Sequence, residues 1–300
     1  MRLALALALM LACRPAAPAC STCEALAVEL QKWHDARVAA LRADQGWLTL
    51  AGLYWLDEGE HELGAAETSD LVFPAGAPPT IGTLTLLNGE VRLRTADGVD
   101  ARIAGARVGD VALRSDADPA LPADRVELGA RFTFLIIKRG ERLAVRLYDR
   151  ESPARRGFAG IPRFPASSAW QIKARFEAHE KPRQVEHPTV LGASVPAEVP
   201  GVAVFTVDGA EHRLAPILER GPHGDELLFV FRDLTSGVET YAGGRFLVTP
   251  LPTDGALVLD FNRAHNPPCA FTEHATCPVP LPENRLALRV EAGEHTPAGH

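Results

Sequence analysis

The hydrophobic and polar positions divide the chain into one helical stretch followed by many short strands. Between residues 24 and 43, apolar residues recur at spacings of three and four, which predicts a helix with one buried face. The apolar stripe contains Leu26, Leu30, Trp33 and Leu41. Arg37 interrupts this stripe, and we expect it to lie at the solvated rim of the helix.

Beyond Gly46 the helical period disappears, and short apolar runs alternate with turn dipeptides. Asn88-Gly89, Asp97-Gly98 and Asp208-Gly209 are typical of tight hairpin turns. The predicted fold class is therefore mainly β, with antiparallel sheets forming a sandwich-like unit followed by a barrel-like sheet, and one N-terminal amphipathic helix. A single continuous β structure is the alternative.

A segment rich in Pro and Gly, from Pro153 to Pro165, is the best candidate for a boundary between β units. The predicted organisation has four parts: a leader at 1–19, a linker and helix at 20–46, a first β unit at 47–152, and a second β unit at 165–295 that ends in a polar motif.

The first residues have the character of an export signal, because Arg2 precedes a short apolar run that ends at Ala12. Such a run is shorter than the roughly 20 residues needed to span a bilayer. In one interpretation Cys13 becomes lipidated and tethers the protein to a membrane. In the other, cleavage after Ala19 releases a soluble protein. Both place the folded part outside the cytoplasm, in the cell envelope or the periplasm.

Composition and absent motifs exclude several function classes. The 300 residues carry a net charge of −7, so the chain as a whole has no nucleic-acid footprint. The sequence contains no G-x-S-x-G, P-loop, G-x-G-x-x-G or H-E-x-x-H motif. The usual serine hydrolases, P-loop enzymes and zincins are therefore unsupported, and no cofactor is predicted.

Polar residues gather where the predicted C-terminal strands end. Strand alternation places Asp260 and Asn262 on one face, while Asp233 follows an apolar column and precedes Tyr241 and Arg245. If these strands pair, the five side chains can meet in a polar pocket. The alternative is structural: an ion pair between Arg245 and Asp260, with turns fixed by local hydrogen bonds.

A basic stretch lies in the middle of the chain. Between Lys138 and Arg163 there are eight basic and only three acidic residues. Arg146 and nearby Asp149 are the candidate binding residues there, since clustered arginine can hold a carboxylate or phosphate in two hydrogen bonds. A solvated, charge-paired strand face is the alternative.

These observations lead to three functional hypotheses. The first is a cell-envelope module that binds a small polar or anionic ligand through Arg146, Asp149, Asp233, Tyr241, Arg245, Asp260, Asn262 and Asn266. The second is a hydrolase-like enzyme that uses Asp233 or Asp260 as a base and arginine to stabilise an anion. The third is a structural lipoprotein without a site. Whether the protein is an enzyme stays open.

Cys269 and Cys277 follow a stiff turn formed by Asn266-Pro-Pro. In an exported protein, a disulfide between them is the favoured interpretation. A zinc site that also uses His265 and His274 has suitable ligand types but no established spacing, so no metal is predicted. Thiol catalysis by Cys269, with His265 as base, is a further alternative.

Several motifs resemble the bacterial domain-of-unknown-function family 1684 across about residues 30 to 295. They are Gly46–Leu56, Arg146–Asp149, Phe158–Gly160, Phe164-Pro165, Asp233–Gly237, Thr240-Tyr241, Gly244–Phe246, Asp260–Asn262, Asn266–Cys269 and Cys277-Pro278. The resemblance implies a predominantly β protein, often an exported lipoprotein, and no established activity. Family members tend to carry aromatic residues where His265 and His274 stand, which weakens the zinc alternative.

Overall fold

The computed structural model describes residues 21–118, 120–192, 194–221 and 224–298. The leader, including Cys13, lies outside these residues. The predicted helix is confirmed as α1 (Ser21–Arg42), and it buries Leu26, Leu30 and Leu41. Two of the predicted hairpin turns are confirmed as well: Asn88-Gly89 joins β4 to β5, and Asp208-Gly209 joins β13 to β14, each with positive φ at both residues.

The protein is mainly β, and its sheets are built almost entirely from antiparallel pairs. In the first half of the chain, a six-stranded sheet has the order β1-β11-β10-β9-β6-β7 and a five-stranded sheet the order β3-β2-β4-β5-β8. The strands are β1 (Leu50–Trp55), β2 (Gly59–Gly64), β3 (Leu71–Val72), β4 (Gly82–Leu87), β5 (Glu90–Thr95), β6 (Ala101–Ile103), β7 (Ala106–Arg107), β8 (Asp110–Leu113), β9 (Val126–Leu128), β10 (Phe132–Arg139) and β11 (Arg142–Asp149).

The two sheets of this half enclose a common core, because their strands alternate buried apolar residues toward one another. Phe134 and Ile136 of β10 and Val145 and Leu147 of β11 point into it. The residues between them, including Arg146, therefore lie on the opposite face of the six-stranded sheet. That face carries a second apolar cluster containing Leu135 and Tyr148.

The second half contains a sheet of order β14-β13-β12-β18 and a sheet of order β15-β16-β17, both packed around one core. The strands are β12 (Gln171–Pro188), β13 (Ser194–Val207), β14 (Ala210–Leu214), β15 (Ile217–Gly221), β16 (Gly224–Phe231), β17 (Arg245–Pro250) and β18 (Ala256–Asp260). Strand pairing among the described residues leaves these sheets open, so the expected barrel-like unit is not a closed barrel.

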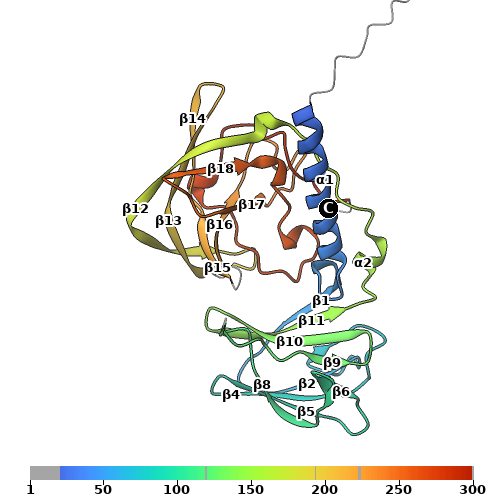
Figure 1. Ribbon diagram of the computed structural model, residues 1–300. Coiled ribbons are helices and arrows are strands. Elements are labelled where there is room, and N and C mark those ends of the chain that lie inside the picture. The colour runs from blue at the N-terminus through green and yellow to red at the C-terminus, as the bar shows by residue number, and fades with distance from the viewer. Residues whose placement is uncertain (1–20, 119, 193, 222–223, 299–300) are drawn as a thin grey trace, which may run out of the picture.

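Short helices fill the connections: η1 (Trp47–Thr49), α2 (Pro153–Gly157), η2 (Ser168–Trp170), η3 (Phe261–Arg263), η4 (Pro268–Ala270) and η5 (Pro282–Asn284). Helix α1 runs alongside the β12–β18 part of the molecule (Figure 1), and its Arg37 pairs with Glu294 of the C-terminal segment. The sheet containing β1, β10 and β11 lies below that part in the same view. The boundaries of the β units proposed from the sequence remain predictions.

Candidate functional site

Arg245 and Asp233 form a fully buried ion pair with an N–O distance of 3.4 Å. Asp233 also accepts hydrogen bonds from the Thr235 and Ser236 hydroxyls and from the Val290 backbone N–H, while Arg245 donates to the backbone carbonyls of Val290 and Ala292. The partner of Arg245 is therefore Asp233, and the expected pair with Asp260 is wrong. These two residues fasten the C-terminal tail to β16 and β17.

Asp260 and Asn262 lie at the end of β18, as the strand pattern predicts, but they hold a loop together. Asp260 Oδ1 accepts from the Asn262 backbone N–H at 3.2 Å and from Asn262 Nδ2 at 2.8 Å. Asn262 in turn bonds both the N–H and the carbonyl of Ser167 at 2.9 Å. Asp260 also lies 3.5 Å from Arg263 Nε.

The basic stretch is largely neutralised by neighbouring carboxylates. Asp149 receives two hydrogen bonds of 2.8 Å from Arg131, which lower its pKa against the opposing effect of burial. Asp44 pairs with Arg150 and Arg155. This part of the chain is therefore mostly a charge-paired surface.

Arg146 differs from these arginines because it is buried and, among the described residues, has no carboxylate within ion-pair distance. Its guanidinium lies 5.5 Å from the centroid of the Trp47 ring, and its Nε has no hydrogen-bond partner in the part of the chain that is described. Burial lowers the pKa of this guanidinium, and the Tyr148 hydroxyl lies beside it.

A cavity of about 220 Å³ has Asn266, a residue with an unmatched buried polar atom, in its wall. We call it the polar cavity. It lies between α1, η1, the outer face of β15–β17 and the segment from His265 to Phe271. Its lining residues are Arg37, Leu41, Trp47, Glu219, Leu228, Phe246, Val248, His265, Asn266, Pro268 and Phe271.

Asn266 is the residue of this cavity with an unsatisfied group. Its Nδ2 donates to the His295 carbonyl at 2.7 Å, which fixes the orientation of the amide. Its Oδ1 is buried and has no partner among the described residues. A buried acceptor left unpaired costs about 1–3 kcal/mol, so this oxygen is set up to receive a donor.

Arg37 and Glu294 hold the backbone of Asn266 in place by hydrogen bonds. The Arg37 side chain is 17% exposed and pairs through Nε with Glu294, which is 1% exposed. Arg37 Nη2 donates to the Asn266 carbonyl at 2.8 Å, and Glu294 accepts from the Asn266 backbone N–H at 2.7 Å. Our expectation that Arg37 lies at a solvated rim is wrong, because its charge is matched by a residue 257 positions away.

Two titratable side chains flank Asn266 in the cavity wall. The loss of water around the half-buried His265 ring, together with the Arg37 charge, lowers the His265 pKa to about 3, so this imidazole is neutral. Glu219 lies at the solvent-facing side, yet the surrounding protein and the charge of Glu226 raise the pKa of its carboxyl. The cavity wall therefore contains one arginine, Arg37, whose charge Glu294 neutralises, and one further carboxyl group, that of Glu219. It carries no excess positive charge.

Cys269 and Cys277 are free thiols in this structure, so the predicted disulfide is not found. The Cys269 backbone N–H donates to Cys277 Sγ at 3.2 Å, and the Cys269 carbonyl accepts from the Tyr241 hydroxyl at 3.2 Å. These hydrogen bonds hold the turn with both sulfurs reduced. No group of three or more potential metal ligands occurs in the described ranges, and the zinc alternative with His265 and His274 gains no support there.

The structure thus divides the predicted site residues into three groups. Asn266 lines the polar cavity. Arg146 does not line it, but its guanidinium lies 5.5 Å from the centroid of the Trp47 ring, which does. Tyr241 contacts the neighbouring Cys269 turn. The others belong to local structural networks: Asp149, Asp233, Arg245, Asp260 and Asn262.

Sequence analysis missed most residues of the polar cavity, among them Trp47, Glu219, Phe246 and Phe271. One signal was available, because Arg37 interrupts an otherwise apolar helical stripe. A charge on a buried helix face needs a partner from another element. The identity of that partner, Glu294, depends on the tertiary fold.

Comparison with known proteins supports the resemblance for the second half of the chain. A family model described as "Protein of unknown function (DUF1684)" matches residues 156–295. The expected resemblance is therefore confirmed over this region, which is just under half of the chain. The DUF1684 region contains β15–β17 and the Asn266 turn, whereas Arg37, Trp47 and Arg146 lie outside it.

Two solved structures share weaker similarity. An uncharacterized protein of Haloarcula marismortui, solved by solution NMR, is 29% identical over 49% of this chain and 83% of its own, with a TM-score of 0.40. The structure titled Rv0020c_FHA is 15% identical over 32% of this chain and 90% of its own, with a TM-score of 0.22. At these TM-scores neither likeness defines the fold or a ligand. No curated protein matched the chain. Among the described residues, no helix has the length and apolar character needed to cross a membrane.

Proposed function

We propose that this protein binds a small, neutral polar molecule in the polar cavity, from a position in the cell envelope. The observation that carries the proposal is the buried Oδ1 of Asn266, which lacks a donor although its amide orientation is fixed. Trp47, Phe246 and Phe271 supply the apolar walls that small-molecule sites usually have.

The charges around the cavity favour a neutral ligand over the anion that the arginine-rich sequence suggests. Glu294 already neutralises Arg37, and Glu219 adds a further carboxyl. Arg37 Nη1 makes no hydrogen bond within the described residues, so it can donate to a ligand acceptor. A primary amide matches this arrangement, because its NH2 group donates to Asn266 Oδ1 while its carbonyl accepts.

Hydrolysis with Asp233 or Asp260 as base has less support than binding. Asp233 is surrounded by donors that use both of its oxygens, and Asp260 caps the η3 turn. Neither residue lines the polar cavity. A general base must come within hydrogen-bond reach of its substrate, and both carboxylates are committed elsewhere.

The binding proposal is tested by calorimetric titration of propanamide, with N,N-dimethylpropanamide as the ligand lacking an N–H donor. We expect the dimethyl compound to bind about tenfold or more weakly, since the Asn266 oxygen would stay unpaired. Sodium propanoate, the anionic analogue, should also bind more weakly than propanamide.

A matched pair of variants locates the binding. Val248→Trp fills the polar cavity from an outward-facing position of β17 and should abolish propanamide binding. Val258→Trp places the same side chain on a half-exposed position of β18, away from this cavity, and should leave binding unchanged. Equal binding by both variants, or no binding of propanamide by the wild type, would refute the proposal and favour a purely structural role.

The location in the cell envelope is a separate part of the proposal. It is supported by the Arg2 start, the apolar run and Cys13 in the sequence. Lipidation at Cys13 would place the protein in the membrane fraction, and Cys13→Ala should move it to the soluble fraction. A wild-type protein found only in the cytoplasm would contradict export.

A further inference from the structure

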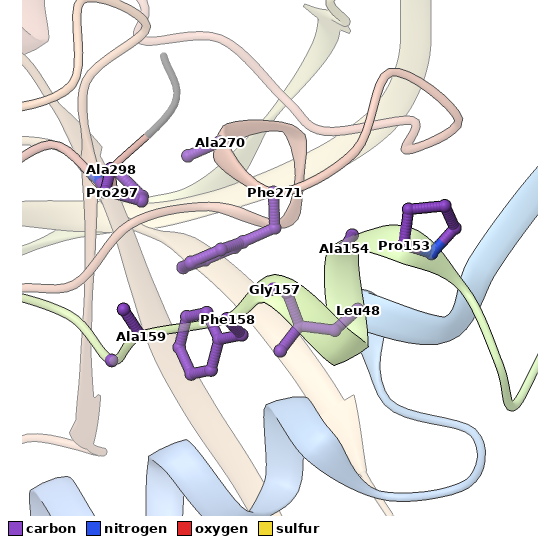
Figure 2. Close-up of a pocket in the computed structure, with 11 residues that line it drawn as sticks. Leu48, Pro153, Ala154, Gly157, Phe158, Ala159, Ala270, Phe271, Pro297 and Ala298 are labelled. Carbon is purple, nitrogen blue, oxygen red and sulfur yellow. The ribbon is translucent and has the colours of Figure 1, made fainter.

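A second cavity also has the Phe271 ring in its wall (Figure 2). We call it the apolar cavity. It has a volume of about 280 Å³ and contains no charged side chain in its wall. Its lining residues are Leu48, Pro153, Ala154, Gly157, Phe158, Ala159, Gly160, Ala270, Phe271, Pro297 and Ala298.

Phe271 is the wall that both cavities share. On the side of the polar cavity, the Arg37 guanidinium lies 5.9 Å from the centroid of its ring. Toward the apolar cavity, the Phe158 ring meets it edge to face, with centroids 6.3 Å apart and an interplanar angle of 74°. Phe271 is only half-buried and follows the short helix η4, and its ring lies at the edge of the small apolar cluster of Leu41, Leu48 and Ile161.

Neither cavity alone reaches the size of an ordinary ligand site, which is about 300–1,000 Å³. If the two cavities join past the Phe271 ring, their combined volume falls within that range. One end would then present the Asn266 oxygen and Arg37, and the other would present Leu48, Phe158 and small residues. This polarity is that of an amphiphile: a hydrogen-bonding head joined to an apolar tail.

We infer that the natural ligand is a neutral amphiphile whose amide-like or hydroxyl-bearing head occupies the polar cavity and whose unbranched acyl or alkyl chain enters the apolar cavity past Phe271. The inference rests on the proposed function and extends it to the ligand class. Taking about 30 Å³ for each methylene-sized group, roughly the volume of a water molecule, the apolar cavity of about 280 Å³ holds a chain of about nine carbons.

The side chains of the apolar cavity favour an apolar occupant. They are aliphatic or aromatic, so an alkyl chain that covers them removes apolar surface from water. The small residues Ala154, Gly157 and Ala159 leave this space unfilled. Gly157 is exposed, and an added Cβ there would meet no atom within 4 Å.

The test is a titration of the full mature protein with unbranched primary amides of increasing length, from propanamide to dodecanamide. Each methylene that enters the apolar cavity should lower the Kd about fourfold, until the cavity is filled and the gain stops. Intermolecular NOEs from the terminal methyl of heptanamide to the Phe158 ring provide a direct check on where the chain lies.

Gly157→Leu adds a side chain at the wall of the apolar cavity without requiring a left-handed backbone, since Gly157 does not have a positive φ. In this variant the Kd should cease to depend on chain length while propanamide binding is retained. Gly109→Leu is the matched control: it is exposed, its added Cβ meets only Thr95 Oγ1 at 4.0 Å, and it lies outside both cavities.

The outcomes separate this inference from the proposed function. Propanamide binding with no gain from longer chains overturns the amphiphile and leaves the polar site intact. A chain-length gain that survives in Gly157→Leu, with NOEs to residues other than Phe158, also overturns it. Failure of every amide to bind overturns both. A fourfold gain per methylene that is lost in Gly157→Leu and kept in Gly109→Leu supports the inference.

Discussion

The buried pair of Arg245 and Asp233 provides the sharpest test of how the predicted polar residues are used. Every group around the Asp233 carboxylate is a donor: the Thr235 and Ser236 hydroxyls, the Val290 N–H and the Arg245 guanidinium. In Asp233→Asn, one acceptor oxygen becomes an NH2 group that faces donors. Arg245 is then left as a buried cation without a counter-charge.

Removing one partner of a buried ion pair typically costs about 3–5 kcal/mol, because the remaining charge is desolvated and unmatched. We expect this loss for Asp233→Asn, and a similar loss for Arg245→Met. The double variant should lose less than the two single losses combined, since it leaves neither charge unpaired. The carbonyls of Val290 and Ala292 lose their donor in both Arg245 variants, so some destabilisation remains.

Urea unfolding followed by circular dichroism and by tryptophan fluorescence measures these differences. Coincident transitions by both probes are needed before the midpoints are converted to free energies of unfolding, because a chain of this size can unfold in more than one step. Asp254→Asn is the matched control, because Asp254 occupies an exposed turn with φ of 51°, a conformation that asparagine tolerates.

The control should change stability by no more than about 0.5 kcal/mol. A loss below about 1 kcal/mol in Asp233→Asn would show that solvent reaches the pair. The structural assignment of Asp233 and Arg245 would then be wrong, and the polar pocket predicted from the sequence would again be the better explanation.

Three further predictions concern the surroundings of the polar cavity. Glu294→Gln should lower the free energy of unfolding in urea by about 1–3 kcal/mol, because it leaves the Arg37 guanidinium without its counter-charge. The same variant should bind propanamide more weakly. Unchanged stability and binding would contradict the role of this pair. Iodoacetamide should alkylate Cys269 before Cys277, as measured by peptide mass spectrometry. The reason is that hydrogen bonding lowers the pKa of the Cys269 thiol, whereas the contact with Cys269 and burial raise the pKa of the Cys277 thiol. Resistance of both thiols to alkylation without a reductant would indicate a disulfide in solution. Because the pKa of the Glu219 carboxyl is raised by folding, this group keeps its proton to a higher pH in the folded protein than in the unfolded chain. As the pH rises above the unfolded pKa of about 4.5, Glu219 therefore reduces the free energy of unfolding. Glu219→Gln should therefore match the wild type at pH 4 and exceed it at pH 7 by about 0.5 kcal/mol, the modest size reflecting its solvent exposure; a gain that is larger at pH 4 would reverse the assignment.

Local chemistry made much of the fold predictable from the sequence. Asn88-Gly89 and Asp208-Gly209 specify their turns through backbone conformations that few other residues adopt. The apolar period of α1 was long enough to identify the helix and its buried face. Strand ends are less predictable: β17 begins pairing only at Arg245, because the preceding Gly243 and Gly244 lie in a turn.

The site was less predictable, because it depends on contacts between residues far apart in the chain. Strand alternation correctly placed Asp233 on the face of Phe229 and Phe231, but it could not choose between Arg245–Asp260 and Arg245–Asp233. That choice is made by the register of β16 and β17, in which Phe231 lies opposite Arg245 and brings Asp233 within reach.

The best candidate residue, Asn266, is not one of the conspicuous polar residues whose hydrogen bonds are all satisfied by the fold. Conspicuous polar residues at strand ends find partners close in sequence, as Asp260 does with Asn262, and a group with all partners supplied by the fold has nothing left for a ligand. Asn266 uses its N–H, its carbonyl and its Nδ2 within the protein and leaves only Oδ1 unmatched. A single unmatched acceptor on an otherwise fully held side chain combines rigidity with a vacant hydrogen bond, which is the arrangement that favours binding a donor with little loss of side-chain entropy.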